Sequence, residues 1–239
     1  GEFADRDGGL VTRAVALPPE ARPETTLVIL KPENFKKGSA RPGNIVDMFA
    51  RTGLFIVGAK ILHLTMAQAE EFYGPLKEIF IQRLRGNVAR RAGDCLRQAF
   101  TFDIPAEAIE EIGDILKTYN AEHEFNRIVE YMTGRNPAKL TSPGERHQSG
   151  VTKCLALLYH GERAIEKIRE RLGVTNPREA KAGSIRSVYG DDLMRNAAHA
   201  SDSVASAERE RRIIGLWDDK PPCDVTSIID EYLASLARR

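Results

Sequence analysis

Short apolar runs alternate with amphipathic stretches along most of the chain. Runs rich in β-branched and aliphatic residues predict strands, because such residues suit a buried position in a sheet. The predicted strands are Thr25 to Leu30, Leu54 to Leu64, Val151 to Tyr159 and Ile213 to Trp217. Apolar residues at helical spacing predict helices at Gly43 to Arg51, Met66 to Phe80, Glu162 to Leu172 and Asp224 to Arg238.

Local signals support several of these helix boundaries. Thr65 and Gln68 form the sequence pattern of a capping box, in which each side chain bonds the other residue's backbone. Gly173 stands where a glycine commonly follows a helix. The run Ser201-Asp202-Ser203 is typical of a helix start, because Ser and Asp accept bonds from free backbone N–H groups.

The order of elements predicts the fold class. Two strand–helix–strand units with four strands indicate an α/β (α+β) protein with a ferredoxin-like βαββαβ sandwich. We expect a four-stranded antiparallel sheet with its helices on one face. The predicted domains are an N-terminal arm at 1–24, the main domain at 25–217 and a tail with a helix at 218–239.

A helical insertion is predicted to interrupt the main domain at about residues 82–148. It is rich in arginine, and two amphipathic runs follow one another within it. These arginines suit either a nucleic-acid-binding patch or a solvated helix face, and the pattern favours the solvated face. They are Arg83, Arg85, Arg90, Arg91 and Arg97.

Composition narrows the function classes. The chain has 239 residues, and 42% of them are hydrophobic, which is enough for one substantial core. The formal net charge of +1 gives no general attraction to nucleic acid or membrane, so any anion site must be built locally. The three cysteines are far apart and indicate a reduced, cytoplasmic protein. We find no run of the ~20 apolar residues that a membrane span needs.

One segment carries a candidate nucleophile. His199 precedes the predicted helix start at Ser201 to Ser203, and Glu210 lies eleven residues beyond the histidine. An imidazole near a helix N-terminus, with a carboxylate from the same helix, has the parts of an activated nucleophile. A lone histidine is more often structural or exposed, so the flanking residues decide its interpretation.

The segments around His199 offer groups that suit phosphate. Arginine forks bind phosphate oxygens in pairs and keep their charge near neutral pH. The common nucleotide-binding motifs are absent from the sequence. The predicted phosphate-binding residues are Lys31, Arg169, Thr175, Arg186 and Asn196.

These residues together resemble the nucleoside diphosphate kinase family. The similarity covers about residues 25–80 and 150–217, with part of 124–132. It is carried by Leu30-Lys31-Pro32-Glu33, Tyr73, Arg169, Gly173-Val174-Thr175-Asn176-Pro177, Gly183-Ser184-Ile185-Arg186, the run from Arg195 to Ser203, Glu208 and Glu210.

The resemblance implies a ping-pong transfer of the γ-phosphate from ATP to a nucleoside diphosphate. His199 would form a phosphohistidine, and Glu210 would hold the far imidazole nitrogen. Magnesium would bind the phosphates, with Asp202 near it through water. Lys31, Tyr73, Arg169, Thr175, Arg186 and Asn196 would hold phosphates and ribose, while Leu193 and Phe125 would contact the base. The family also implies a homo-oligomer.

Two departures from the family pattern affect this hypothesis. Ala200 stands where the family usually has glycine. Either Phe125 or Phe80 could take the base-stacking position, but Glu124 aligns with it at least as well. An alternative is therefore a catalytically weak or inactive relative that acts as a nucleotide-binding or regulatory interaction module. A third alternative is nucleic-acid binding by the arginine-rich insertion.

Overall fold

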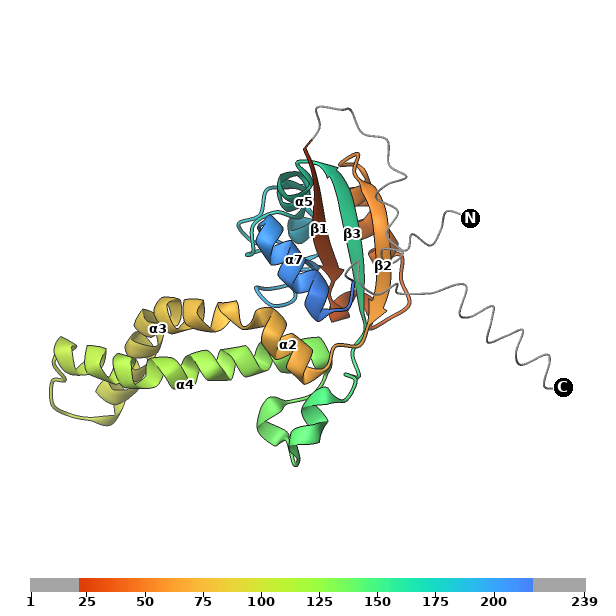
Figure 1. The fold of residues 1–239 in the computed structure, drawn as a ribbon. Coiled ribbons are helices and arrows are strands. Elements are labelled where there is room, and N and C mark those ends of the chain that lie inside the picture. The colour runs from red at the N-terminus through yellow and green to blue at the C-terminus, as the bar shows by residue number, and fades with distance from the viewer. Residues whose placement is uncertain (1–21, 217–239) are drawn as a thin grey trace, which may run out of the picture. The chain divides into compact units, whose positions relative to one another are not determined.

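The computed structural model describes residues 22–216 (Figure 1). The predicted N-terminal arm up to residue 21, Trp217 and the predicted helix Asp224 to Arg238 lie outside the described residues. The chain divides into a sheet unit, made of residues 22–63 and 153–216, and a helical unit, Leu64–Thr152. Within residues 22–216, no helix combines the length and the apolar character needed to cross a membrane.

The sheet unit contains four strands and four α-helices. Its strands are β1 (Pro23–Leu30), β2 (Phe55–Leu62), β3 (Cys154–Glu162) and β4 (Ala198–Ala200). Its helices are α1 (Arg41–Ala50), α5 (Ala164–Leu172), α6 (Ile185–Tyr189) and α7 (Val204–Ile213), with a 3₁₀ turn, η2 (Pro32–Phe35), after β1. The order along the chain matches the predicted ferredoxin-like sandwich.

The four strands form one antiparallel sheet in the order β2-β3-β1-β4. Central strand β1 pairs with β3 along its whole length, and its last three residues pair with β4. In this register Ile29 lies opposite His199. The predicted fold class is therefore confirmed, and His199 is fixed to the end of the central strand.

The predicted fourth strand was placed wrongly. Ile213 ends helix α7, while Ile214 and Leu216 are buried in the turn that follows. Gly215 has a φ of 66°, and the Leu216 N–H donates to the Arg211 carbonyl at 2.9 Å. The apolar run therefore indicated burial rather than extended structure. The true fourth strand is only three residues long, which is too short for an apolar period to reveal.

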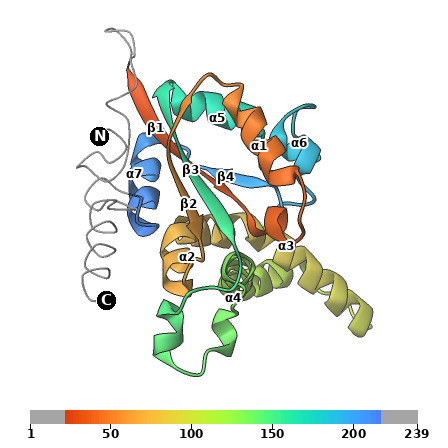
Figure 2. The same ribbon diagram turned by 90° about the vertical axis from the view of Figure 1, so that its right-hand side faces the viewer.

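Helices cover both faces of the sheet, whereas the sequence predicted one. Val28, Leu30 and Tyr159 belong to a core cluster with residues of α1 and α5, such as Phe49 and Ile168. Neighbouring strand residues point to opposite faces, so Ile29 and its partner on β4 face the other way. That second face is covered by α7 (Figure 2). The face of the sheet that carries His199 is therefore the one beneath α7.

The helical unit contains α2 (Met66–Tyr73), α3 (Pro75–Ala99) and α4 (Ala106–Thr133), followed by two 3₁₀ turns, η3 (Pro137–Lys139) and η4 (Pro143–His147). The capping box is confirmed: Thr65 Oγ1 accepts from the Gln68 N–H, and Gln68 Oε1 accepts from the Thr65 N–H, both at 3.1 Å. The predicted helix Met66 to Phe80 divides before Pro75, which lacks an N–H and begins a new helix.

Helices α3 and α4 form an antiparallel hairpin (Figure 1). Their backbones approach closely because both contact positions are small: a Cβ on Gly113 would lie 2.5 Å from the Ala89 Cβ. Arg85 Nε donates to Asp114 at 2.8 Å, and Arg85 also pairs with Glu110 at 2.9 Å. Since these charged groups are exposed, apolar and small residues contribute most of the packing.

Candidate active site

His199 is held from two sides by the sheet unit. It lies in β4, and its Nε2 is 2.8 Å from Oε2 of Glu210 on α7. The Glu210 side chain is only 5% exposed, while that of His199 is 22% exposed. Ser201 is buried and donates its hydroxyl to the same Glu210 oxygen at 2.6 Å. Because Ser201 and the imidazole share this oxygen, the position of the ring is tightly determined.

This contact assigns the tautomer of the imidazole. A buried carboxylate accepts hydrogen bonds, so the Nε2 atom of neutral His199 carries the proton. The lone pair of the neutral ring is then on Nδ1. The geometry thus separates the two nitrogens into one that orients the ring and one that has nucleophilic character.

The residues before His199 follow an unusual backbone path. Ala197 is buried and has a φ of 72°, a conformation that residues with a Cβ rarely adopt. Its carbonyl accepts from the Lys31 N–H at 3.0 Å and from Asn34 Nδ2 at 2.7 Å, while its N–H donates to Glu33 at 2.9 Å. These bonds hold the strained residue in place, and they join the end of β1 to the start of β4.

Lys31 is the cation that follows β1. Its Nζ donates to Oδ1 of Asn196 at 2.7 Å and to the Met194 carbonyl at 2.9 Å. Burial, opposed by the charge of Glu33 and assisted by the charge of Arg186, lowers the Lys31 pKa to about 8. A lysine held by neutral acceptors beside another cation is well prepared to accept an anion.

Arg186 lies in α6, close to the backbone around His199. Its guanidinium donates to the Gly173 carbonyl at 2.9 Å and to the Ala198 carbonyl at 3.1 Å. Burial lowers the Arg186 pKa to about 10, with a contribution from the positive charge of Arg169. Two arginines and Lys31 therefore share one electrostatic environment, which disfavours the protonated forms and favours a bound anion.

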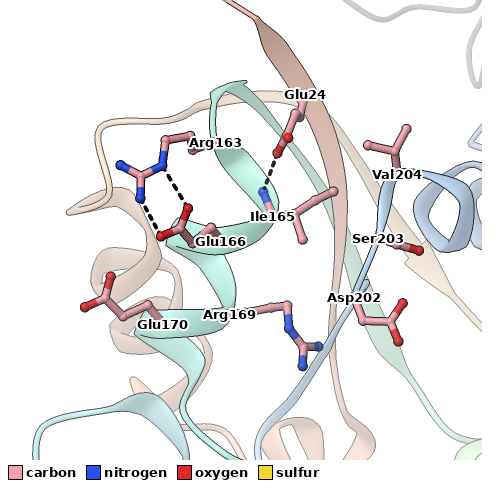
Figure 3. A pocket seen from close by; sticks show the side chains of 9 residues that line it. All are labelled: Glu24, Arg163, Ile165, Glu166, Arg169, Glu170, Asp202, Ser203 and Val204. Atoms are coloured by element: carbon pink, nitrogen blue, oxygen red, sulfur yellow. Dashed lines mark hydrogen bonds and ion pairs between the residues drawn. The ribbon is translucent and has the colours of Figure 1, made fainter.

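Arg169 and Asp202 extend into one open groove of the sheet unit (Figure 3). The Asp202 pKa is lowered, mainly because the Ser206 hydroxyl donates to its carboxylate, with a contribution from the Arg169 charge. Elsewhere in the groove Arg163 is paired with Glu166, and Glu24 accepts from the Ile165 N–H at 3.2 Å. The groove therefore joins two predicted site residues, but His199 is not among the residues that line it.

Asn196 connects two further predicted residues to Lys31. It is buried, and its Nδ2 donates to the carbonyls of Thr175 and Leu193, each at 3.0 Å. All the polar atoms of its amide thus contact the protein, so Asn196 positions its neighbours. The Thr175 side chain is exposed, and Leu193 is 64% exposed, as a contact surface for a ligand would be.

Tyr73 and Phe125 belong to the helical unit. Tyr73 ends α2 and is buried against Phe72, with ring centroids 4.9 Å apart. Phe125 in α4 is only 7% exposed, and Lys77 Nζ lies 5.8 Å from its ring centroid. Phe125 is thus packed within the helical unit, and Tyr73 and Phe125 both belong to a different unit from His199.

Comparison with known proteins places the chain in a family. The family model described as nucleoside diphosphate kinase matches residues 24–85 and 109–215. A nucleoside diphosphate kinase of Bdellovibrio bacteriovorus is 32% identical over 187 residues, covering 78% of this chain and 89% of the relative. The chain belongs to the nucleoside diphosphate kinase family. It is therefore a phosphotransferase enzyme.

Solved structures agree with this assignment. The nucleoside diphosphate kinase of Aquifex aeolicus is 26% identical, with a TM-score of 0.51, and the match covers 82% of this chain and 99% of that one. The enzyme of Encephalitozoon cuniculi is 21% identical, with a TM-score of 0.53 and coverage of 84% and 94%, and it supports the fold alone. The family match omits residues 86–108, which form the second half of α3, the loop after it and the first three residues of α4 in this kinase.

The replacement of the family's glycine after the histidine is compatible with this fold. Ala200 lies in β4 opposite Val28, and its φ is not among the positive values of the described residues. An extended backbone accepts a Cβ without strain. The alanine in this kinase therefore keeps the geometry of the His199 strand.

Sequence reasoning missed several residues that shape the site of this kinase. Ser201 was interpreted only as part of a helix start, although Ser203 is the residue that caps α7. Glu33 and Asn34, which hold Ala197, were visible only as neighbours of Lys31. A serine two residues from a histidine gives no signal by itself, because its contact with Glu210 depends on how β4 and α7 meet.

Proposed function

We propose that this enzyme transfers the γ-phosphate of ATP to nucleoside diphosphates through a phosphohistidine at His199. The observation that carries the proposal is the buried Glu210 carboxylate on Nε2, which leaves nucleophilic character on Nδ1. Lys31 and Arg186 lie in the same unit, where their charges favour a bound phosphate. An oriented neutral imidazole beside fixed cations suits phosphoryl transfer.

The chemistry consists of two balanced displacements. In the first, the Nδ1 lone pair of His199 forms a bond to the γ-phosphorus, and the bond from phosphorus to the bridging oxygen breaks. The nucleoside diphosphate leaves with that electron pair. In the second, a terminal oxygen of another diphosphate attacks the phosphorus, and the P–N bond returns its electrons to Nδ1. The proton stays on Nε2 throughout, hydrogen-bonded to the Glu210 carboxylate. The negative charge of Glu210 balances the positive charge of the phosphorylated ring.

The cations supply most of the expected rate enhancement. Phosphoryl transfer passes through a loose transition state with charge on the phosphoryl oxygens, so positioning and electrostatic stabilisation dominate. We assign Lys31 and Arg186 to the transferred phosphate and Arg169 to the neighbouring one. Asn196 positions the Lys31 ammonium through the 2.7 Å bond between them. Thr175 and Tyr73 are assigned to the remaining phosphate and ribose contacts, and Leu193 to the base.

The donor set suits a magnesium ion that is held chiefly by phosphates. Within residues 22–216, no three acidic, histidine or cysteine side chains gather in a way that could hold a metal ion. Asp202 offers one ionised carboxylate in the groove that it shares with Arg169. We assign it a contact to the ion through water, since Mg²⁺ usually keeps several waters. When bound, the ion would neutralise charge on the nucleotide phosphates.

Labelling with γ-labelled ATP tests the proposal. Wild-type protein is incubated with ATP and magnesium, and the label is expected on His199 in an acid-labile, base-stable form that ADP, GDP or CDP removes. Coupling between phosphorus and ¹⁵N-labelled imidazole then distinguishes Nδ1 from Nε2. The matched control is His147→Ala, which removes an exposed histidine of the helical unit and should leave the labelling unchanged.

Each outcome separates the alternatives. Label on His199 that transfers to a diphosphate supports the ping-pong kinase. Label on Nε2 would refute the role of Glu210, and label on another residue would refute His199 as the nucleophile. Nucleotide binding without any label would support the catalytically weak relative instead. We further propose that the enzyme is a homo-oligomer, as is typical of the family, and sedimentation measurements test this.

A further inference from the structure

The α3–α4 hairpin has one apolar side. Ala89 and Gly113 mark the contact line between the two helices. Successive residues of a helix are rotated by about 100° around its axis. In an antiparallel pair, the residue before Ala89 on α3 and the residue before Gly113 on α4 therefore point to the same side of the hairpin. This side, which we call the apolar face, contains Leu84, Val88, Ile112, Ile115, Leu116 and Tyr119. The hairpin is therefore amphipathic as a pair of helices.

Much of the apolar face is open to solvent. Ile115 is 66% exposed and Tyr119 is 72% exposed, while Leu84, Val88 and Ile112 are partly exposed. By the same rotation, Arg83, Arg90 and Arg97 lie on the other side of α3, on the side where Asp114 extends from α4. A contiguous exposed apolar surface beside a charged one is typical of an interaction site.

The edges of the apolar face carry opposite charges at the same height. Arg91 is two residues beyond Ala89 on α3, and Glu111 is two residues before Gly113 on α4. Because the helices run in opposite directions, both side chains lie at the same level of the hairpin. Both are exposed, and neither forms an ion pair within residues 22–216. At this height the α3 edge of the face thus carries the positive charge of Arg91, and the α4 edge carries the negative charge of Glu111.

We propose that the apolar face binds the same face of a second copy of this chain, which gives a four-helix bundle. A two-fold axis parallel to the hairpin places α3 of one copy over α4 of the other. The apolar faces are then buried together, and Arg91 of each copy meets the partner's Glu111. Glu111 on the α4 edge would repel an anionic lipid or nucleic acid, whereas a second copy places opposite charges together at both edges.

This contact is independent of the phosphoryl transfer. Val88 and Arg91 belong to residues 86–108, the segment outside the family match. The other residues of the face and Glu111 lie inside the match, so the contact combines the unmatched segment with matched parts of α3 and α4. It adds to any other contacts that the sheet units make. Its loss should change the assembly and leave the His199 chemistry intact.

Charge reversal in the full chain provides the first test. Arg91→Glu places two glutamates opposite each other at both symmetric contacts, and Glu111→Arg places two arginines there. Each variant alone should associate roughly tenfold more weakly in sedimentation velocity. An equimolar mixture of the two variants restores opposite charges at both contacts, so it should regain the wild-type mass. The matched control is Arg83→Glu, on the charged side, which should leave the association unchanged.

Cross-linking between copies provides the second test. In a background that carries Cys95→Ser and Cys223→Ser, and in which Cys154 is buried, Val88→Cys chains are mixed with Ile115→Cys chains and oxidised. A disulfide between the two kinds of chain can form only between copies, and we expect it as the main product. The control mixture combines Ile115→Cys with Arg90→Cys, which lies on the other side of α3 and should form little product.

Three results would overturn the proposal. The first is equal mass for wild type, both single variants and their mixture, together with no cross-link between Val88→Cys and Ile115→Cys. The second is equal cross-linking in the Arg90→Cys control. The third is a chain ending at residue 216 in which Ile115→Cys becomes more reactive toward a maleimide while the mass is unchanged. That result would assign the face to the segment 217–239 of the same chain.

Discussion

The sheet unit and the helical unit use charged residues in opposite ways. Around His199, charged groups bond to buried backbone and amide groups: Glu33 accepts from the Ala197 N–H, and Lys31 donates to Asn196. In the hairpin, charged groups bond to one another at the surface, as Arg85 does with Asp114. Buried hydrogen bonds to charges contribute about 1.5–3 kcal/mol, whereas surface ion pairs contribute about 0–1 kcal/mol.

This difference separates the residues that set activity from those that set stability. Several hydrogen bonds to buried groups fix the position of each site residue and tolerate little movement. This suits a reaction that depends on positioning. The hairpin depends on close helix contact, and its surface charges can be exchanged at small cost. Substitutions around His199 should therefore affect turnover, whereas substitutions in the α3–α4 hairpin should affect the unfolding midpoint or the assembly.

His199→Ala should have the largest effect on turnover. Removal of the only atom that carries the phosphoryl group should abolish transfer between ATP and GDP, a loss of at least about 10⁴-fold as measured in a coupled assay. The unfolding midpoint should change little, because the side chain is partly exposed and Ser201 still bonds Glu210. Wild-type turnover in this variant would remove His199 from the mechanism.

Arg186→Ala should have the second-largest effect on turnover. The guanidinium stabilises charge that develops in the transition state, so its loss should lower kcat/KM by roughly 10²- to 10³-fold. The matched control is Arg83→Ala, which removes an exposed arginine of the hairpin and should leave kcat/KM unchanged within about twofold. Equal losses in the two variants would contradict the distinction between the units.

How much of this arrangement the sequence could predict depends on the range of the contacts involved. The capping box at Thr65 and the glycine after α5 involve residues close in the chain, and both predictions were confirmed. The position of β4 depends on pairing between Ile29 and His199, which no local pattern specifies. Motif residues such as Lys31 and Arg186 were identifiable from family resemblance.

The contacts that position the motif residues could not be predicted in the same way. Ser201 reaches Glu210 only because α7 packs over the end of β4. The conformation of Ala197 requires Glu33 and Asn34 from the turn after β1. The contacts of Ala197 join segments more than a hundred residues apart, and the contact of Ser201 depends on how a strand packs against a helix. A residue type alone gives no signal of either. The close approach of Ala89 and Gly113 is hidden for the same reason.

A pair of glycines in the hairpin sharpens the stability side of the comparison. A Cβ on Gly113 would meet the Ala89 Cβ at 2.5 Å, whereas a Cβ on Gly86 would meet nothing within 4 Å. Gly113→Ala should therefore destabilise the protein by about 1–3 kcal/mol through overpacking. Gly86→Ala should stabilise it by up to about 1 kcal/mol through helix propensity. Urea unfolding measures both, and equal shifts would show that the helices separate freely.

The smallest effect concerns the pH dependence of diphosphate binding. The Lys31 pKa is lowered from 10.5 to about 8 by burial, so the free enzyme loses this proton near pH 8. Because the folded state binds fewer protons than the unfolded state between these values, the lysine's contribution to stability rises with pH across that window. A bound phosphate favours the ammonium, so ADP affinity should fall up to tenfold per unit between about pH 8 and 9.5.

Calorimetry of ADP binding in buffers with different ionisation enthalpies tests this effect directly. Proton uptake on binding should appear above pH 8 and be absent at pH 7. Lys31→Arg keeps a positive charge throughout this range, so its affinity should be nearly flat with pH even where its absolute affinity is lower. Arg186 has a pKa lowered only to about 10, so it stays charged over most of the window. A wild-type affinity that is as flat as that of Lys31→Arg would show that Lys31 does not face the phosphates.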